Sequence, residues 1–364
     1  MPPEKKRDTL AILKDDLKSG NIGSLYIFHG EEKYLSEHYL GLMKTALISE
    51  DMQQFNLFSF DGKGLDPDSF VDALESAPMF AERKLVIVTD LDVYKAPAAL
   101  KNTLEAALED IPEYTCLVFV YDSLEYKTDA RAKIHRIIKE YARVIEFPIQ
   151  ESRDLISWLK RRFKVHNKLI DNSTAEYMLF ICGKSMTALI NEVEKVGAYS
   201  SGGSVTRQDI DAICTPVLDA VVYDMTDSIA EGRFDQAFKL LDELNAMRSE
   251  PIVILAAIGR QMRQLLCARE AIDCGGIASA AKHPGSVGNN WGGGAEDLFM
   301  TAASLSSRYI AGKVMSLARR KPAEWYAEAC RLCIECDYDI KTSAGGGVDL
   351  LKTMLLRLSE SNGK

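Results

Sequence analysis

Short apolar segments alternate with amphipathic segments over the first 148 residues of the chain. Five apolar segments have the length of buried strands: 25–29, 55–60, 85–90, 116–121 and 144–147. Between them lie segments with the pattern of amphipathic helices, at 34–49, 66–76, 98–108 and 130–141. Strands that alternate with helices of this length indicate a parallel sheet with helical crossovers. We therefore predict a three-layer α/β domain.

The strand pattern ends near residue 148, and amphipathic helical patterns continue from there. A short helical block reaches about residue 213 and contains turn clusters at 171–173 and 200–204. Residues 214–216 (Cys-Thr-Pro) mark a boundary before a longer helical block. We therefore predict an α/β plus all-α protein with three domains, at residues 1–148, 149–213 and 214–364.

Composition limits what these domains can do. The chain has 364 residues, of which 47% are hydrophobic, and a formal net charge of −9. A protein that holds DNA by itself concentrates Lys and Arg, so we expect any role with nucleic acid to be shared. No apolar run approaches the roughly 18–20 residues that cross a bilayer, and the N-terminal segment has no signal-peptide pattern. We expect a cytoplasmic protein without a membrane segment.

Two features are candidates for contact with DNA. The densest basic run consists of Lys160, Arg161, Arg162, Lys164 and Lys168. It is interpreted as a solvated helix face, with a minor DNA contact as the alternative. Trp291 lies in the Gly-rich segment 285–294, which is interpreted as a loop, with stacking on a DNA base as the alternative.

The glycine after the first strand occupies the place of a phosphate-binding loop. P-loop nucleotide hydrolases require Gly, four residues and then Gly-Lys-Ser or Gly-Lys-Thr, so that backbone N–H groups and a lysine face the phosphates. Here Gly30 is followed by Leu-Ser-Glu at the positions of the Gly-Lys-Ser. Glu37 would repel a triphosphate where a lysine would attract it. We predict a degenerate loop that holds no nucleotide.

Two further segments imitate parts of a nucleotide site. Residues 183–185 are Gly-Lys-Ser, but a helical segment precedes them and Met178 stands where the first glycine is required. We interpret them as a helix terminus. Asp90 ends a buried strand, as a magnesium-binding acid would, but no lysine accompanies it. It is interpreted as a turn or cap residue.

Three cysteines form a C-x-x-C-x-x-C run, which suggests an iron–sulfur or zinc site. Cys330, Cys333 and Cys336 share one face of a continuous helical pattern, and no fourth ligand lies nearby in the sequence. We therefore expect these residues to pack in the core and predict no metal site. The eight cysteines of the chain lie mostly in apolar patterns, as free thiols do.

Four segments together resemble a known family. They are 25–32 (LYIFHGEE) with Tyr34-Leu35, 78–88 (PMFAERKLVIV), 250–252 with 258–266 (IGRQMRQLL), and 336–342 (CDYDIKT). In this order they resemble the delta subunits of bacterial DNA polymerase III clamp loaders, over nearly the whole chain. The resemblance implies an AAA+-like domain with a degenerate P-loop, a small helical lid domain and a helical collar domain.

The resemblance also implies a function. Delta subunits bind the beta sliding clamp and hold it open for loading onto primed DNA, while other subunits hydrolyse ATP. Their clamp-binding Leu-Phe pair, at the end of a helix, falls on Met79 and Phe80 here. The collar implies packing with the tau/gamma and delta prime subunits. No cofactor and no catalytic activity of the isolated chain are expected, although the holoenzyme is a DNA-directed DNA polymerase, a nucleotidyltransferase.

Three alternatives stay open from the residues alone. The chain would be an active ATPase if a lysine near Glu37 completed the site, or a metal protein if the three cysteines were ligated. Met79 and Phe80 would have a structural role only, if they fastened the end of their helix to the following strand.

Overall fold

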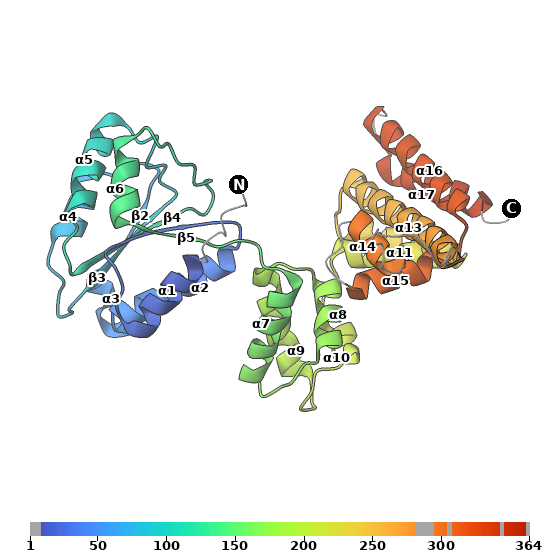
Figure 1. Ribbon diagram of the computed structural model, residues 1–364, viewed down its shortest axis with the longest axis horizontal. Helices are drawn as coiled ribbons and strands as arrows, with labels where there is room; N and C mark the ends of the chain where they lie inside the picture. The colour runs from blue at the N-terminus through green and yellow to red at the C-terminus, as the bar shows by residue number, and fades with distance from the viewer. Residues whose placement is uncertain (1–8, 281–294, 304–307, 343–345, 362–364) are drawn as a thin grey trace, which may run out of the picture. The chain divides into compact units, whose positions relative to one another are not determined.

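The computed structural model describes residues 9–280, 295–303, 308–342 and 346–361. The chain divides into two compact units, Met1–Gln150 and Glu151–Lys364 (Figure 1). The first unit contains the sheet, and the second is built of helices. The expected α/β plus all-α fold class is therefore confirmed, whereas the division of the helical part near residue 213 stays a prediction.

The sheet of the first unit has five parallel strands in the order β2-β3-β4-β1-β5. The strands are β1 (Leu25–His29), β2 (Leu57–Asp61), β3 (Lys84–Thr89), β4 (Thr115–Val120) and β5 (Arg143–Glu146). The central strands β1, β3 and β4 are almost entirely buried, as their apolar sequences require.

Helices cover the sheet and connect its strands (Figure 1). They are α1 (Thr9–Ser19), α2 (Lys33–Leu47), the short α3 (Gln53–Asn56), α4 (Pro67–Glu75), α5 (Ala98–Glu109) and α6 (Lys133–Tyr141). The buried faces of α4, α5 and α6 form one core with inward side chains of β1, β3 and β4. Helix α2 packs against β3 and α1 against β5. The predicted helices and strands all occur, and β2 starts at Leu57 because α3 occupies the residues before it.

The second unit begins with four helices: α7 (Ser152–Val165), α8 (Asn172–Cys182), α9 (Met186–Tyr199) and α10 (Arg207–Ile213). The starts of α8, α9 and α10 are set by side-chain caps. Asp171 and Ser185 accept hydrogen bonds from the first turns of α8 and α9, and Thr206 forms a reciprocal capping box with Asp209.

The following helices share a single apolar core. They are α11 (Leu218–Ala230), α12 (Phe234–Ala246), α13 (Pro251–Ala280), α14 (Ala295–Ala302), α15 (Arg308–Ala318), α16 (Ala323–Thr342) and α17 (Gly347–Ser361). The long helix α13 packs against α11, α14, α15 and α16. Within the described ranges, no helix is both long and apolar enough to cross a membrane.

Candidate protein-binding loop

The loop between α4 and β3, residues 76–83, presents two large apolar side chains to solvent. Met79 is 50% exposed and Phe80 is 87% exposed. The expectation that they end a helix needs correction, because α4 ends at Glu75 and Pro78 cannot donate the hydrogen bond that would continue it. Phe80 has a left-handed backbone with φ of 52°, which is uncommon for a large residue and has to be maintained by its surroundings.

A buried asparagine holds the backbone of this loop. Asn56, the last residue of α3, is fully buried, and its side-chain amide makes two hydrogen bonds with the backbone of Met79. Its Nδ2 donates to the Met79 carbonyl oxygen at 2.8 Å, and the Met79 N–H donates to its Oδ1 at 2.8 Å. Nδ2 also donates to the carbonyl oxygen of Met52 at 3.1 Å. The amide thus fixes the residue directly before Phe80 to α3.

A buried lysine fastens the start of the same loop. Lys84 is fully buried, and its Nζ donates to the backbone carbonyl oxygen of Ser76 and, at 3.1 Å, to its Oγ. The ammonium lies 5.8 Å from the ring centroid of Phe58 and 5.4 Å from that of Tyr114, so two aromatic faces stabilise its charge. Burial lowers the pKa of Lys84 to about 8. The Tyr114 hydroxyl donates to the Glu75 carbonyl oxygen at 2.6 Å.

The end of the loop is attached to the segment before β1. The guanidinium of Arg83 donates to the carbonyl oxygens of Ile22, at 2.5 Å, and Gly23, at 3.2 Å. Residues 76–83 are therefore anchored at their start, middle and end, while Phe80 projects away from the protein. Because the loop backbone is already fixed, Phe80 can bind a partner without a further loss of backbone conformational entropy.

The glycine at the phosphate-loop position has a packing role. Gly30 has φ of 130°, and a Cβ atom added to it would lie 2.2 Å from the carbonyl oxygen of Phe147. Packing against Phe147, which follows β5, therefore requires a glycine at position 30, whether or not a phosphate binds there. The Glu32 N–H donates to the same oxygen at 3.0 Å, which ties the start of α2 to this segment.

The space around Gly30 is small and carries acidic side chains. A cavity of about 220 Å³ is lined there by Gly30, Ser36, Glu37 and the ion pair between Lys33 and Asp122. The ion pair joins Lys33 Nζ to the Asp122 carboxylate at 3.1 Å. This lysine is thus engaged with an acid, and Glu37 adds a second negative charge, so the arrangement disfavours a triphosphate.

Asp90 has the contacts of a turn residue, as the sequence indicates. Its carboxylate accepts hydrogen bonds from the backbone N–H groups of Asp122, Ser123 and Leu124 at 2.8, 2.8 and 3.1 Å. Burial alone would raise the pKa of Asp90, but the hydrogen bonds from these three groups lower it overall. The carboxylate holds the loop after β4. The segment 183–185 is likewise a helix boundary, since Gly183 ends α8 and Ser185 caps α9.

The basic run lies mostly on α7, and its residues differ in exposure. Arg161 and Lys164 are exposed, whereas Lys160 and Arg162 are half-buried. The Arg162 guanidinium lies 5.7 Å from the ring centroid of the buried Trp158. Lys168 follows the helix and donates to two backbone carbonyl oxygens at 2.6 Å, which indicates a structural role. Trp291 lies outside the described residues.

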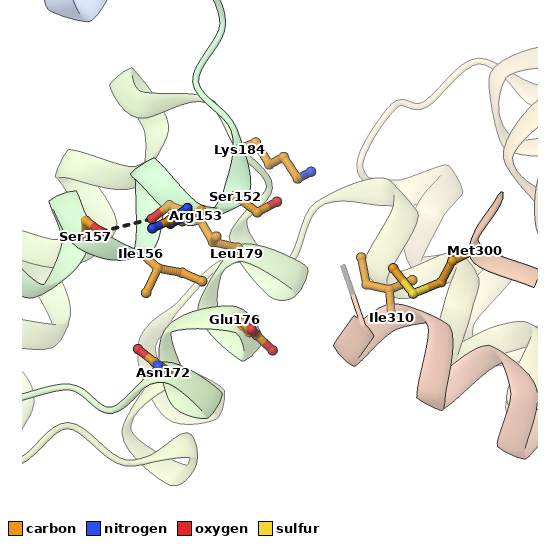
Figure 2. Close-up of a pocket in the computed structure, with 10 residues that line it drawn as sticks. All are labelled: Ser152, Arg153, Ile156, Ser157, Asn172, Glu176, Leu179, Lys184, Met300 and Ile310. Atoms are coloured by element: carbon orange, nitrogen blue, oxygen red, sulfur yellow. Dashed lines mark hydrogen bonds between the residues drawn. The ribbon is translucent and has the colours of Figure 1, made fainter. Parts of the chain in front are cut away.

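A separate cavity of about 510 Å³ lies within the second unit (Figure 2). On one side Figure 2 shows α7 residues that include Arg153 and Ile156, with Glu176 of α8, and on the other side Met300 of α14 and Ile310 of α15. The charged side chains that line it, Arg153, Glu176 and Lys184, have both signs. The site residues predicted from the sequence are not among those that line it.

The three cysteines of the C-x-x-C-x-x-C run lie on α16. Cys333 and Cys336 are buried and Cys330 is half-buried, in the core that α16 shares with α13. Burial raises the pKa of Cys333 to about 12 and that of Cys336 to about 11, so their thiols stay protonated at neutral pH. This burial agrees with the packing role expected from the sequence.

The sheet order and the glycine turn between β1 and α2 define the class of this protein. A parallel β2-β3-β4-β1-β5 sheet with a degenerate phosphate loop, followed by helices, is an AAA+-like architecture without the residues of a working nucleotide site. Comparison with known proteins then specifies the family. The family model of the DNA polymerase III delta subunit matches residues 26–148, and the model of its C-terminal domain matches residues 219–278. The chain belongs to the family of DNA polymerase III delta subunits.

Individual relatives agree with this assignment. The DNA polymerase III subunit delta of Bacillus subtilis is 24% identical over 364 residues, with 96% of each chain covered. That of Escherichia coli is 18% identical, with 70% of this chain and 73% of the relative covered. A solved structure of the Bacillus subtilis DNA clamp loader delta protein has a TM-score of 0.53 at 19% identity, covering 96% of this chain and 99% of that one. The fold is thus shared over nearly the full length.

Proposed function

We propose that this chain is the clamp-binding subunit of a bacterial clamp loader. Through Met79 and Phe80 it binds the beta sliding clamp and opens it for loading onto primed DNA. The observation that carries the proposal is the 87% exposure of Phe80 on a loop whose backbone is fixed by the buried Asn56. Membership of the delta family supports the beta clamp as the partner.

In this proposal the chain itself hydrolyses no ATP. The acidic side chains around Gly30 leave that step to other subunits, the tau/gamma subunits, with which this chain and delta prime assemble through the helices after residue 213. We place this assembly in the cytoplasm, with the replicating DNA.

The two side chains can supply much of the binding energy. Burying a large apolar side chain contributes on the order of 1.5–3 kcal/mol. Phe80 has almost its whole surface available, and Met79 about half. Met is close in volume to the Leu of the family and is flexible enough to fill an irregular pocket. A pair of anchors of this size can dominate an interface.

The test is a binding measurement between the whole chain and the beta clamp of the same organism, by surface plasmon resonance. We expect Phe80→Ala to weaken binding by at least tenfold, since 1.4 kcal/mol corresponds to a factor of ten. Met79→Ala combined with Phe80→Ala should abolish measurable binding. Release of a closed clamp from circular DNA, which requires the ring to open, should be lost in parallel.

The matched control is Leu124→Ala. Leu124 is 43% exposed and follows β4, at the carboxyl edge of the sheet, whereas the 76–83 loop precedes β3 at the amino edge. This variant should bind the clamp as the wild type does. If the double variant stays folded by circular dichroism and binds with unchanged affinity, the proposed binding loop is wrong.

A DNA contact at the basic run is a second, separate proposal. Arg161 and Lys164 are its exposed members and therefore the side chains that phosphates can reach. Because the net charge of the chain is −9, we expect such a contact to matter only in the assembled complex. The double variant Arg161→Ala with Lys164→Ala should lower DNA binding by the complex and leave clamp binding by the lone chain unchanged.

Isothermal calorimetry with ATP and magnesium separates the proposal from an active ATPase. We expect no binding heat at millimolar nucleotide, because the loop lacks the phosphate-binding lysine and Glu37 adds a negative charge beside it. Tight binding would favour the ATPase alternative.

A further inference from the structure

Two cysteines that are far apart in the sequence meet beside a glutamate in the second unit. Cys182 is the last residue of α8, Glu192 lies on α9 and Cys214 directly follows α10. Their two sulfur atoms and a carboxylate oxygen all lie within 4.8 Å of one another. Within the described parts of the chain, this is the group of three or more His, Cys, Asp or Glu side chains that could hold a metal ion.

The fold fixes the positions of these side chains. The N–H of Cys214 donates to the Ile210 carbonyl oxygen at 2.9 Å, which continues the last turn of α10. Three residues later, the N–H of Val217 donates to the Ile181 carbonyl oxygen at 2.8 Å. The segment that carries Cys214 is therefore tied to the end of α8, next to Cys182.

The three groups are shielded from water. Cys182 is buried and Cys214 is half-buried. The Glu192 side chain is only 12% exposed, and its Oε2 has an ion pair with Lys195 Nζ at 2.7 Å. A hydrogen bond to Cys182, together with burial, raises the pKa of the Cys214 thiol.

We propose that Cys182, Cys214 and Glu192 bind one Zn²⁺ ion, which fastens the end of α8 to α9 and to the segment that leads into α11. Thiolate sulfur and carboxylate oxygen are both ligands of zinc in tetrahedral sites, and a water molecule would be the fourth ligand here. At zinc bond lengths of about 2.0–2.3 Å, neighbouring ligand atoms lie about 3.5–3.8 Å apart. Small side-chain rotations would bring the present separations into that range.

The charges also fit a divalent cation. Two thiolates and the Glu192 carboxylate carry three negative charges, which Zn²⁺ and the Lys195 ammonium together neutralise. Without metal, two neutral thiols and the Glu192–Lys195 ion pair are neutral as well. Binding should therefore release two protons, one from each thiol.

The site differs from the C-x-x-C-x-x-C run on α16, which is the more conspicuous one in the sequence. Cys182 and Cys214 have no characteristic spacing, and the fold alone brings them to Glu192. For this reason the sequence predicts no metal site here.

The proposal is tested on the full chain, stripped with a chelator and titrated with Co²⁺ as a spectroscopic substitute for Zn²⁺. We expect one equivalent to produce thiolate-to-cobalt absorption in the near ultraviolet and tetrahedral bands in the visible, both displaced by Zn²⁺. Calorimetry in buffers of different ionisation heat should show release of about two protons per Zn²⁺.

Variants locate the ion. Cys182→Ser and Cys214→Ser should each weaken Zn²⁺ binding by at least a hundredfold, and Glu192→Gln by at least tenfold while the thiolate bands remain. Cys330→Ser is the matched control and should bind as the wild type does. Since a cysteine variant can lose its fold for other reasons, alkylation of the wild-type protein supplies a second measurement. Zn²⁺ should protect the half-buried Cys214 from alkylation but leave the exposed Cys274 reactive.

Either of two results would overturn the proposal. One is a wild-type protein that binds Zn²⁺ no more tightly than the folded variant lacking both Cys182 and Cys214. The other is Zn²⁺ protection that falls on Cys330, Cys333 and Cys336 instead.

Discussion

Asn56→Ala tests whether the 76–83 loop acts through its fixed backbone. Asn56 is fully buried, so its side chain cannot touch a partner of the folded protein. The substitution removes both hydrogen bonds to the Met79 backbone and leaves the Met79 and Phe80 side chains unchanged. Any loss of clamp affinity in a folded variant must therefore come from the loop conformation.

The size of the effect follows from the contacts. Each hydrogen bond contributes about 1 kcal/mol net, and water can reach the half-exposed Met79, so we expect the free energy of unfolding to fall by about 1–3 kcal/mol. Once released, Phe80 leaves its left-handed conformation, and restoring one residue on binding costs about 1–2 kcal/mol. Clamp affinity should fall by about tenfold.

The assay is surface plasmon resonance against the beta clamp, with urea unfolding to confirm that the variant is folded. Asn56→Asp provides a stricter control, because a carboxylate still accepts from the Met79 N–H but repels the carbonyl oxygens of Met79 and Met52. Its affinity should be no higher than that of the alanine variant. If Asn56→Ala binds as tightly as the wild type while Phe80→Ala does not bind, the fixed loop conformation is irrelevant to binding.

Two further predictions concern the residues around the loop and the sheet. The pKa of the buried Lys84 is about 8 in the folded protein, and that of an unfolded lysine is about 10.5. Between these two pH values the unfolded chain binds more protons than the folded one, so the free energy of unfolding rises with pH. Urea unfolding should show that the free energy of unfolding of the wild type, relative to that of Lys84→Met, rises by at most about 3 kcal/mol from pH 7.5 to 10.5. A difference between the two proteins that does not change with pH would contradict the lowered pKa of Lys84. Gly30→Ala should lower the free energy of unfolding by at least about 2 kcal/mol, because its Cβ would overlap the Phe147 carbonyl oxygen at a strained φ, and an unchanged urea midpoint would contradict this.

The secondary structure and the parallel sheet could be predicted from the sequence because they depend on local periodicity. The central strands are apolar along their whole length, and the amphipathic segments between them are long enough for crossovers. The start of β2 was harder to place, because Phe55 continues the apolar pattern although residues 53–56 form α3. Helix and strand propensities are similar over such a short segment. The hydrogen bonds between the Asn56 side chain and the Met79 backbone favour the helix, but they form only in the folded protein.

The candidate sites depend on contacts between residues far apart in the sequence. The exposed Met79 and Phe80 could be selected from the resemblance, but Asn56, 23 residues before Met79, carries no local signal of its role. The same holds for Cys182 and Cys214, which only the fold brings together. By contrast, the degenerate phosphate loop could be recognised at once, since the motif it lacks is a contiguous one.

The two edges of the sheet differ in a way that bears on regulation. Parallel α/β sheets usually bind ligands at the carboxyl ends of their strands, and here that edge is satisfied internally by the Lys33–Asp122 ion pair and the Asp90 carboxylate. The exposed Phe80 lies at the amino edge, about 20 Å away along the six residues of β3. If the carboxyl edge binds no phosphate, as proposed, no differential contact exists there that could change the amino edge. On the same proposal, ATP would control clamp binding from other subunits, by covering or uncovering the 76–83 loop.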